Sequence, residues 1–309
     1  MNGNLSPDEL FGRPSLTNWT IGLSISESPD LPLLGMGEVH LQDALVEFAR
    51  YLLASGATLA YGGDLRKGGF TEILFDLVQT HNQSGPSLFE RVVNFLAWPI
   101  HLKLTQNQKA QLKRVADFRP LDPPADLALD KNEWIAPDSP LNRYTWARSL
   151  TLMREEINRL AHARLLLGGK YQPGSYNGKY PGLAEEALVA LRSGTPLFLI
   201  GGFGGCAKAI IDSLRGKASE IFTAEYQMTD TDYSDFVGFF NEKVIESPSL
   251  NLEPIDYHEL VCFFKSKGIY GLGNGLNEDE NLRLFETPFI SEMISLVLKG
   301  LTKLLQGKK

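Results

Sequence analysis

Short apolar runs alternate with segments of helical periodicity along the first two thirds of the chain. The runs are nearly continuous in apolar residues, which is typical of strands buried on both faces, and they predict strands over residues 20–26, 57–61, 91–100, 163–167 and 196–200. Apolar positions that recur every three or four residues predict helices over residues 40–55, 70–80, 105–117, 141–161, 183–192 and 206–214. This alternation favours an α/β fold, a Rossmann-like doubly wound parallel sheet with helices on both faces.

The alternation fades beyond about residue 217, where the periodicity predicts helices over residues 234–243, 256–267 and 286–305. The last of these is amphipathic, which suits core packing or self-association, so we expect a homo-oligomer. The chain is therefore expected to comprise a flexible lead-in (1–18), a Rossmann-like domain (19–217) and a helical C-terminal extension (218–309). Five prolines within residues 119–140 predict an extended surface connection inside the domain.

Composition and charge narrow the range of partners. The 309 residues are 43% hydrophobic and 22% charged, which is ordinary for a globular protein, and the net charge of −7 disfavours binding to a long nucleic acid. No uninterrupted apolar stretch reaches the roughly 18 residues of a membrane span, and the start lacks a signal-peptide core, so we expect a cytoplasmic protein without membrane contact. The two cysteines and five histidines lack metal-ligand spacing, and neither a metal nor a bound cofactor is expected.

Three of the predicted strands end in a double glycine: Gly62-Gly63, Gly168-Gly169 and Gly201-Gly202. Open parallel sheets bind ligands beyond the carboxyl ends of their strands, and glycine lets a phosphate approach the backbone without meeting a Cβ atom. The N–H groups and dipole of the following helix can then bind the anion. The alternative is that these glycines only form tight turns. Because neither the GxGxxG fingerprint nor the P-loop is present, the pattern predicts a phosphate cradle of another kind.

Residues around these bends complete the candidate binding site. Asp64 and Arg66 lie in the first bend and could contact ribose and phosphate. The alternative is that they are only charged residues on a surface loop. The loop from Gly169 to Gly182 mixes tyrosines, which can stack on a base, with lysines, which can bind phosphate; a solvated loop is the alternative. The candidate ligand contacts are Ser26, Gly62, Gly63, Asp64, Arg66, Gly69, Arg148, Gly168, Gly169, Lys170, Gly182, Gly201, Gly202, Phe203 and Gly204.

Two carboxylates, Glu185 and Glu186, fall in the first turn of the helix predicted after this loop. The helix dipole alone favours acidic residues at that position. The alternative is that one of them faces a ribose hydroxyl.

Two segments of the chain resemble the SLOG superfamily. One runs from Leu23-Ser24-Ile25-Ser26 through Tyr61-Gly62-Gly63-Asp64 to Gly69-Phe70-Thr71, and the other from Met153-Arg154 through Leu167-Gly168-Gly169 to Glu185-Glu186. That group includes the Lonely Guy phosphoribohydrolases, lysine-decarboxylase-like proteins, the DNA-processing protein A family and ligand-sensing domains of prokaryotic conflict systems. The chain is most similar to its cluster 2, and the resemblance covers roughly residues 20–215.

The resemblance implies a catalytic pair, because the hydrolases of this group carry an Arg on the helix before a PGGxGTxxE loop and use it with the Glu. Arg154 falls near that Arg, with Arg148 as the alternative, and Glu185 or Glu186 falls at the Glu. The chain departs from the motif in two respects: no proline precedes Gly168-Gly169, and about ten inserted residues replace the GT step.

Three functions therefore compete. The resemblance implies a sensor of a nucleotide-derived small molecule, such as an ADP-ribose-like molecule or a cyclic nucleotide, with an effector protein encoded nearby. The second is a hydrolase of a nucleotide N-glycosidic bond, in which a Glu stabilises the oxocarbenium-like ribose and Arg154 holds phosphate. The third is an interaction subunit whose pocket has been lost.

Overall fold

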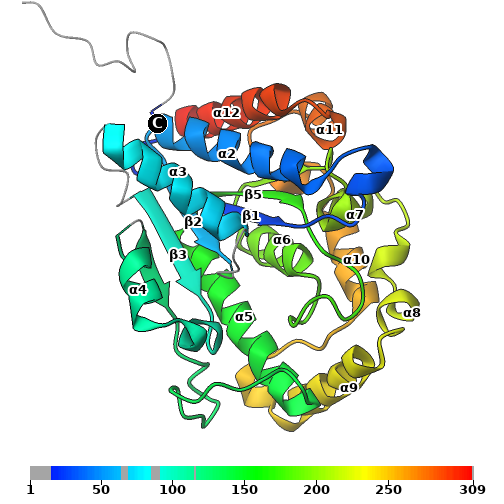
Figure 1. Cartoon of the computed structure of the whole chain (residues 1–309). Coiled ribbons are helices and arrows are strands. Elements are labelled where there is room, and N and C mark those ends of the chain that lie inside the picture. The colour runs from blue at the N-terminus through cyan, green and yellow to red at the C-terminus, as the bar shows by residue number, and fades with distance from the viewer. Residues whose placement is uncertain (1–14, 64–68, 85–90, 115, 308–309) are drawn as a thin grey trace, which may run out of the picture.

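Parallel strands form the centre of the protein. The computed structural model describes residues 15–63, 69–84, 91–114 and 116–307. Within these residues the strands form one six-stranded, all-parallel sheet in the order β4-β3-β2-β1-β5-β6 (Figure 1). They are β1 (Thr20–Ser26), β2 (Thr58–Gly62), β3 (Val92–Leu96), β4 (Asp117–Pro120), β5 (Ala163–Gly168) and β6 (Leu197–Ile200). The predicted Rossmann-like parallel sheet is confirmed.

Helices cover both faces of this sheet (Figure 1). One face carries α2 (Glu38–Ala54), α3 (Phe70–Ser84) and α12 (Ile290–Gly307), and the other carries α5 (Pro140–Leu160), α6 (Gly182–Ser193) and α7 (Gly205–Leu214). Along β5, Leu165 and Leu167 enter the first core while Leu166 enters the second, so this strand is apolar on both sides. The other helices are α4 (Gln106–Leu112), α8 (Ala224–Gln227), α9 (Thr231–Glu246), α10 (Tyr257–Lys267) and α11 (Glu278–Glu286).

The C-terminal helices pack against the sheet domain itself. Phe236 and Phe264 belong to the core on the α6 face, whereas Met293 and Leu301 belong to the core on the α2 face. Helix α11 contacts β6 and α12 contacts α2. Each of these two cores therefore contains residues from both sides of the predicted boundary at residue 217. Among the described residues, no helix has both the length and the apolar character needed to cross a membrane.

One strand escaped the hydrophobic pattern. The helix predicted over residues 105–117 ends at Leu112, and the chain returns at Asp117 as β4, which pairs with β3. Its four residues, Asp-Phe-Arg-Pro, are half-buried or exposed and contain no apolar run. An edge strand is solvated on one side and tolerates proline, so a short β4 carries little hydrophobic signal.

Candidate functional site

The chain reverses its direction across the sheet between β1 and β5. From β1 it moves outward through β2, β3 and β4, and after α5 it returns to the other side of β1 as β5 and then β6. The crevice outside the carboxyl ends of two such strands is where open α/β sheets bind ligands. Ser26 and Gly168 are register partners at this point, so the structure brings together two of the residues predicted to contact the ligand.

Lys170 extends from this switch point toward solvent. Its backbone N–H donates to Ser26 Oγ at 3.2 Å, and its Nζ lies 3.2 Å from Glu27 Oε2. Gly168 and Gly169 adopt φ angles of +68° and +103°, and the Gly169 N–H donates to the Ser26 carbonyl oxygen at 2.9 Å. The side chains of Lys170 and Glu27 are 32% and 31% exposed, so the lysine is accessible from solvent, although the Glu27 Oε2 atom is buried.

The three double-glycine bends lie at one edge of the sheet, because all its strands are parallel, but their surroundings differ. A Cβ on Gly62 would lie 2.5 Å from Ile157 Cδ1 of α5, and Asp64 and Arg66 lie outside the described residues. At the β6 bend, a Cβ on Gly201 would lie 2.2 Å from the Phe285 carbonyl oxygen, and one on Gly202 would lie 2.3 Å from that of Thr287. Close backbone packing therefore accounts for glycine at positions 201 and 202. The remaining candidates at the bends are buried or pack closely: Phe203 in the core, Gly63 on Tyr61 and Thr71, and Gly204 on Asp30.

The N-terminus of α7 already binds a carboxylate. Asp30 Oδ2 accepts from the Gly205 N–H at 2.7 Å, and its Oδ1 accepts from the Tyr171 hydroxyl at 2.7 Å. A helix N-terminus favours an anion, and here the anion is a side chain of the protein. The polar turn after β1 therefore supplies the charge at this bend, where the glycine pattern predicted a phosphate.

Asp30→Ala is expected to lower the free energy of unfolding by about 1–2 kcal/mol, because the helix loses its N-terminal acceptor and charge. Urea denaturation measures the loss. Asp43→Ala, at an exposed position on α2, is the matched control and should change stability by less than about 0.5 kcal/mol. Equal stability of the two variants would contradict a capping role for Asp30.

Arg154, Glu185 and Glu186 meet in a buried network between α5, α6 and the sheet. Arg154 Nη1 donates to Glu185 Oε2 at 2.5 Å, and Arg154 Nε lies 3.9 Å from Glu186 Oε1. Glu185 also accepts from the Thr151 hydroxyl. Glu185 is 2% exposed and Arg154 6%, so the pair implied by the resemblance is formed but buried.

A second arginine, Arg164, completes the network and was missed by the sequence analysis. It lies in β5, is fully buried, and donates to Glu186 Oε2 and, at 2.7 Å, to Ser24 Oγ. A Cβ on Gly22 of β1 would lie 3.2 Å from Arg164 Nε, so glycine there makes room for the guanidinium. Burial lowers the pKa of Arg164, while Glu186 opposes that shift. The sequence signal for this contact is an arginine within an otherwise apolar strand, together with the small residues Gly22 and Ser24 in the strand that pairs with it.

The network has unused hydrogen-bond donors. Arg164 Nε and Nη1 and Arg154 Nε are buried and have no hydrogen-bond partner. Leaving buried charged donors unpaired is costly. The stability of this network therefore depends strongly on Glu185 and Glu186, whose carboxylates neutralise the two arginines.

The loop over residues 169–181, called here the covering loop, lies over this network. A Cβ on Gly178 would lie 2.9 Å from Arg154 Nη1 and 3.2 Å from Glu185 Oε2, and one on Gly182 would lie 3.3 Å from Arg154 Nη2. Burial raises the pKa of Glu155, and the nearby charge of Glu185 raises it further. Burial lowers the pKa of Lys179. The insertion that replaces the GT step thus shields the Arg154–Glu185 pair from solvent.

Tyrosines fasten the covering loop to the C-terminal helices. The Tyr257 hydroxyl oxygen lies 2.9 Å from that of Tyr176 and 2.7 Å from that of Tyr233. Tyr180 accepts from the Asp256 N–H at 2.9 Å. Because Tyr180 is buried and Tyr176 packs against the same core, their rings pack inside the protein and not on a base, the alternative that the loop composition predicted.

Arg148 faces away from the carboxylates. Its Nη1 donates to the Tyr144 hydroxyl and its Nη2 to Asp126 Oδ1, each at 2.8 Å. Of the two arginines left open by the sequence, Arg154 is therefore the one that contacts Glu185.

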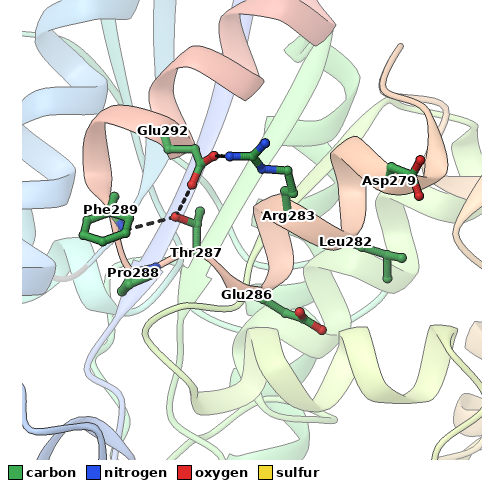
Figure 2. A pocket seen from close by; sticks show the side chains of 8 residues that line it. All are labelled: Asp279, Leu282, Arg283, Glu286, Thr287, Pro288, Phe289 and Glu292. Carbon is green, nitrogen blue, oxygen red and sulfur yellow. Dashed lines mark hydrogen bonds and ion pairs between the residues drawn. The ribbon is translucent and has the colours of Figure 1, made fainter.

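A hollow of about 470 Å³ lies between α11 and α12 (Figure 2). Its only lining cation, Arg283, pairs with Glu292, which also accepts from the Thr287 hydroxyl at 2.6 Å, as the dashed lines in Figure 2 show. Glu286 pairs with Arg215 at 3.0 Å. No predicted site residue lines this hollow.

The family comparison agrees with this architecture. The model of the SLOG cluster 2 family matches residues 15–284, which is most of the chain. The chain belongs to the SLOG cluster 2 family. A search of curated proteins finds no match.

The match extends beyond the region in which the resemblance was recognised, and it includes α9, α10 and most of α11. Within this matched region, α9 and α10 hold the covering loop. The covering loop and the helices that hold it therefore fall within the region that the family model describes. Among the described residues, no group of three or more His, Cys, Asp or Glu side chains is placed to hold a metal ion.

Proposed function

We propose that this SLOG protein is a sensor that binds a nucleotide-derived ligand beyond the carboxyl ends of β1 and β5. The observation that carries the proposal is the meeting of Ser26, Gly168-Gly169 and the accessible Lys170 at the switch point. Membership of a family of nucleotide-related Rossmann-like proteins supports it. The ligand class is an ADP-ribose-like molecule or a cyclic nucleotide.

The surroundings of the bends favour one orientation of the ligand. Asp30 occupies the α7 N-terminus and would repel a phosphate there. The proposed phosphate contacts are therefore Lys170 and the first bend, from Gly62-Gly63 to Gly69, with Arg66. Asp64 is the proposed ribose contact.

The enclosure of the two glutamates favours sensing over hydrolysis. Glu185 is 2% exposed and is held by Thr151 and Arg154. The side chain of Glu186 is 12% exposed and is held by Ser24 and Arg164, so both carboxylates are engaged by side chains of the protein. One observation favours the hydrolase as a second candidate: Arg154 contacts Glu185, as in the pair that the resemblance implies. That reaction requires the covering loop to move, because substrate cannot otherwise reach Glu185.

The covering loop offers a route for signalling. Lys170 begins this loop, and its tyrosines contact α9 and α10, so ligand bound at Lys170 would bias the packing of the C-terminal helices. The proposal places the protein in the cytoplasm as a homo-oligomer, acting on an effector encoded nearby in a prokaryotic conflict system.

Isothermal titration with ADP-ribose, AMP and cyclic AMP tests the proposal. Lys170→Ala is expected to weaken binding about tenfold, the loss of one charge-assisted contact. Lys243→Ala is the matched control, because Lys243 is a similarly exposed lysine that pairs with Glu246 on α9. A probe at 100 times its dissociation constant should also stabilise the wild-type fold by about 2.7 kcal/mol.

Chromatography of AMP and NAD after incubation with the protein separates the two candidates. Binding without release of free base supports the sensor. Release of base that disappears in Glu185→Gln supports the hydrolase. Equal affinities of Lys170→Ala and the wild type would contradict the placement of the ligand at the switch point.

A further inference from the structure

A basic hollow of about 380 Å³ lies beside the edge strand β4, which β3 and β2 separate from the switch point. Its volume is within the range of small-molecule pockets. The residues that define its chemistry are His101, Lys109, Lys113, Phe118, Lys131 and Asn132.

The hollow is positive although the chain is acidic. Three lysines line it against one carboxylate, Asp122, whereas the whole chain has a net charge of −7. Lys109 lies on α4 and Lys113 follows it one turn later as the residue that caps the helix, a spacing at which like charges repel. None of the ion pairs among the described residues involves either of them, and Lys131 reaches Asp122 only at 3.6 Å.

Buried groups hold the walls of this hollow in place. The indole N–H of Trp98, which is 1% exposed, donates to the Lys131 carbonyl oxygen at 3.0 Å. His101 Nε2 lies 2.9 Å from the Leu121 carbonyl oxygen. Burial, with a smaller contribution from Lys109, lowers the pKa of His101, which favours the neutral imidazole. A neutral ring bonded to a carbonyl acts as a fixed wall.

We infer that this hollow is a second binding site, separate from the switch point, for a small phosphorylated molecule. The phosphate lies between two lysines at α4, Lys109 and Lys113, and a third, Lys131, on the facing segment. The phosphate supplies the negative charge that these lysines lack. The half-buried side chain of Phe118 provides an apolar surface for the rest of the ligand. Lysines bind phosphate as point charges and impose little geometry, so the site selects for charge and size.

Titration of the full-length protein with pyrophosphate and with AMP tests this inference. Lys109→Glu/Lys113→Glu is expected to weaken binding of at least one probe tenfold or more, because two favourable charges become repulsive. Lys265→Glu/Lys267→Glu is the matched control, since both lysines lie on α10 at the opposite side of the sheet (Figure 1). Asp122→Asn should strengthen binding, because it removes the only acidic group in the lining.

The two probes identify the chemistry of the ligand. Pyrophosphate that binds as tightly as AMP indicates recognition of phosphate alone, and preference for AMP indicates that the Phe118 surface takes part. Equal affinities for the α4 and α10 double variants would overturn the inference, as would the absence of binding by either probe at millimolar concentration. In a Lys170→Ala background, which weakens the switch-point site, Lys109→Glu/Lys113→Glu should still lower the affinity for pyrophosphate, so failure of one site would be seen separately from failure of the other.

Discussion

Replacement of Arg164 by alanine is expected to lower the free energy of unfolding by about 3–5 kcal/mol, because removing one partner leaves a buried charge uncompensated. Arg164 is fully buried and is the cation bonded directly to Glu186. In the variant, Glu186 would keep only the Ser24 hydroxyl as a hydrogen-bond donor and Arg154 Nε at 3.9 Å as a nearby charge. Guanidinium chloride denaturation followed by circular dichroism measures the loss.

Two further variants separate the lost charge pair from a general packing defect. Arg148→Ala removes an arginine whose ion pair with Asp126 lies nearer the surface, and it should lower the free energy of unfolding by only about 1 kcal/mol. Arg164→Met combined with Glu186→Leu replaces the buried pair by apolar side chains and should recover most of the stability. If Arg164→Ala were no more destabilising than Arg148→Ala, the buried network would not contribute to stability as its contacts indicate.

The sequence predicted the fold well where burial left a hydrophobic signal. The apolar runs at β1, β2, β5 and β6 are strands in the interior or at the covered edge of the sheet, and each was found near its observed bounds. The half-exposed strand β4 had no such signal. Helix α12 was found by its periodicity, whereas the short helix α11 before it, with five charged residues among nine, was not.

The candidate site was only partly accessible to the same reasoning. The resemblance identified Arg154 and the two glutamates, and the structure brings all three together. Spacing along the chain could not show that Arg164 reaches Glu186, because the two lie on different elements and meet only after α6 folds back on β5. Nor could the composition of the covering loop show that its tyrosines pack against α9 and α10.

The glycine pattern illustrates a physical ambiguity. A double glycine indicates that something approaches the backbone closely, and that can be a phosphate or another part of the chain. At Gly201 it is the last turn of α11, and at Gly202 it is the backbone between α11 and α12. At Gly168 it is the carbonyl oxygen of Ser26. Only the neighbouring elements, which lie far away in the sequence, distinguish these cases.

Gly201→Ala is accordingly expected to destabilise the protein by about 3 kcal/mol, near the upper end of the range for overpacking. The new Cβ would lie 2.2 Å from the Phe285 carbonyl oxygen and 2.8 Å from Ile211 Cδ1, and the first of these atoms belongs to the backbone and cannot rotate away. The strain should be relieved by displacement of the last turn of α11 and of the connection to α12 that follows it. Limited proteolysis should therefore cut this connection faster in the variant, and urea denaturation should show the loss of stability.

Gly238→Ala is the matched control, because Gly238 lies on the exposed side of α9 with no atom within 4 Å of the added Cβ. That change should stabilise the protein by about 0.5–1 kcal/mol, since alanine favours a helix more than glycine does. The loss in Gly201→Ala should have the same size with and without a nucleotide probe, because the strain arises from packing of the chain on itself. A loss that appeared only as weaker ligand binding, with unchanged stability and proteolysis, would show instead that this bend contacts the ligand.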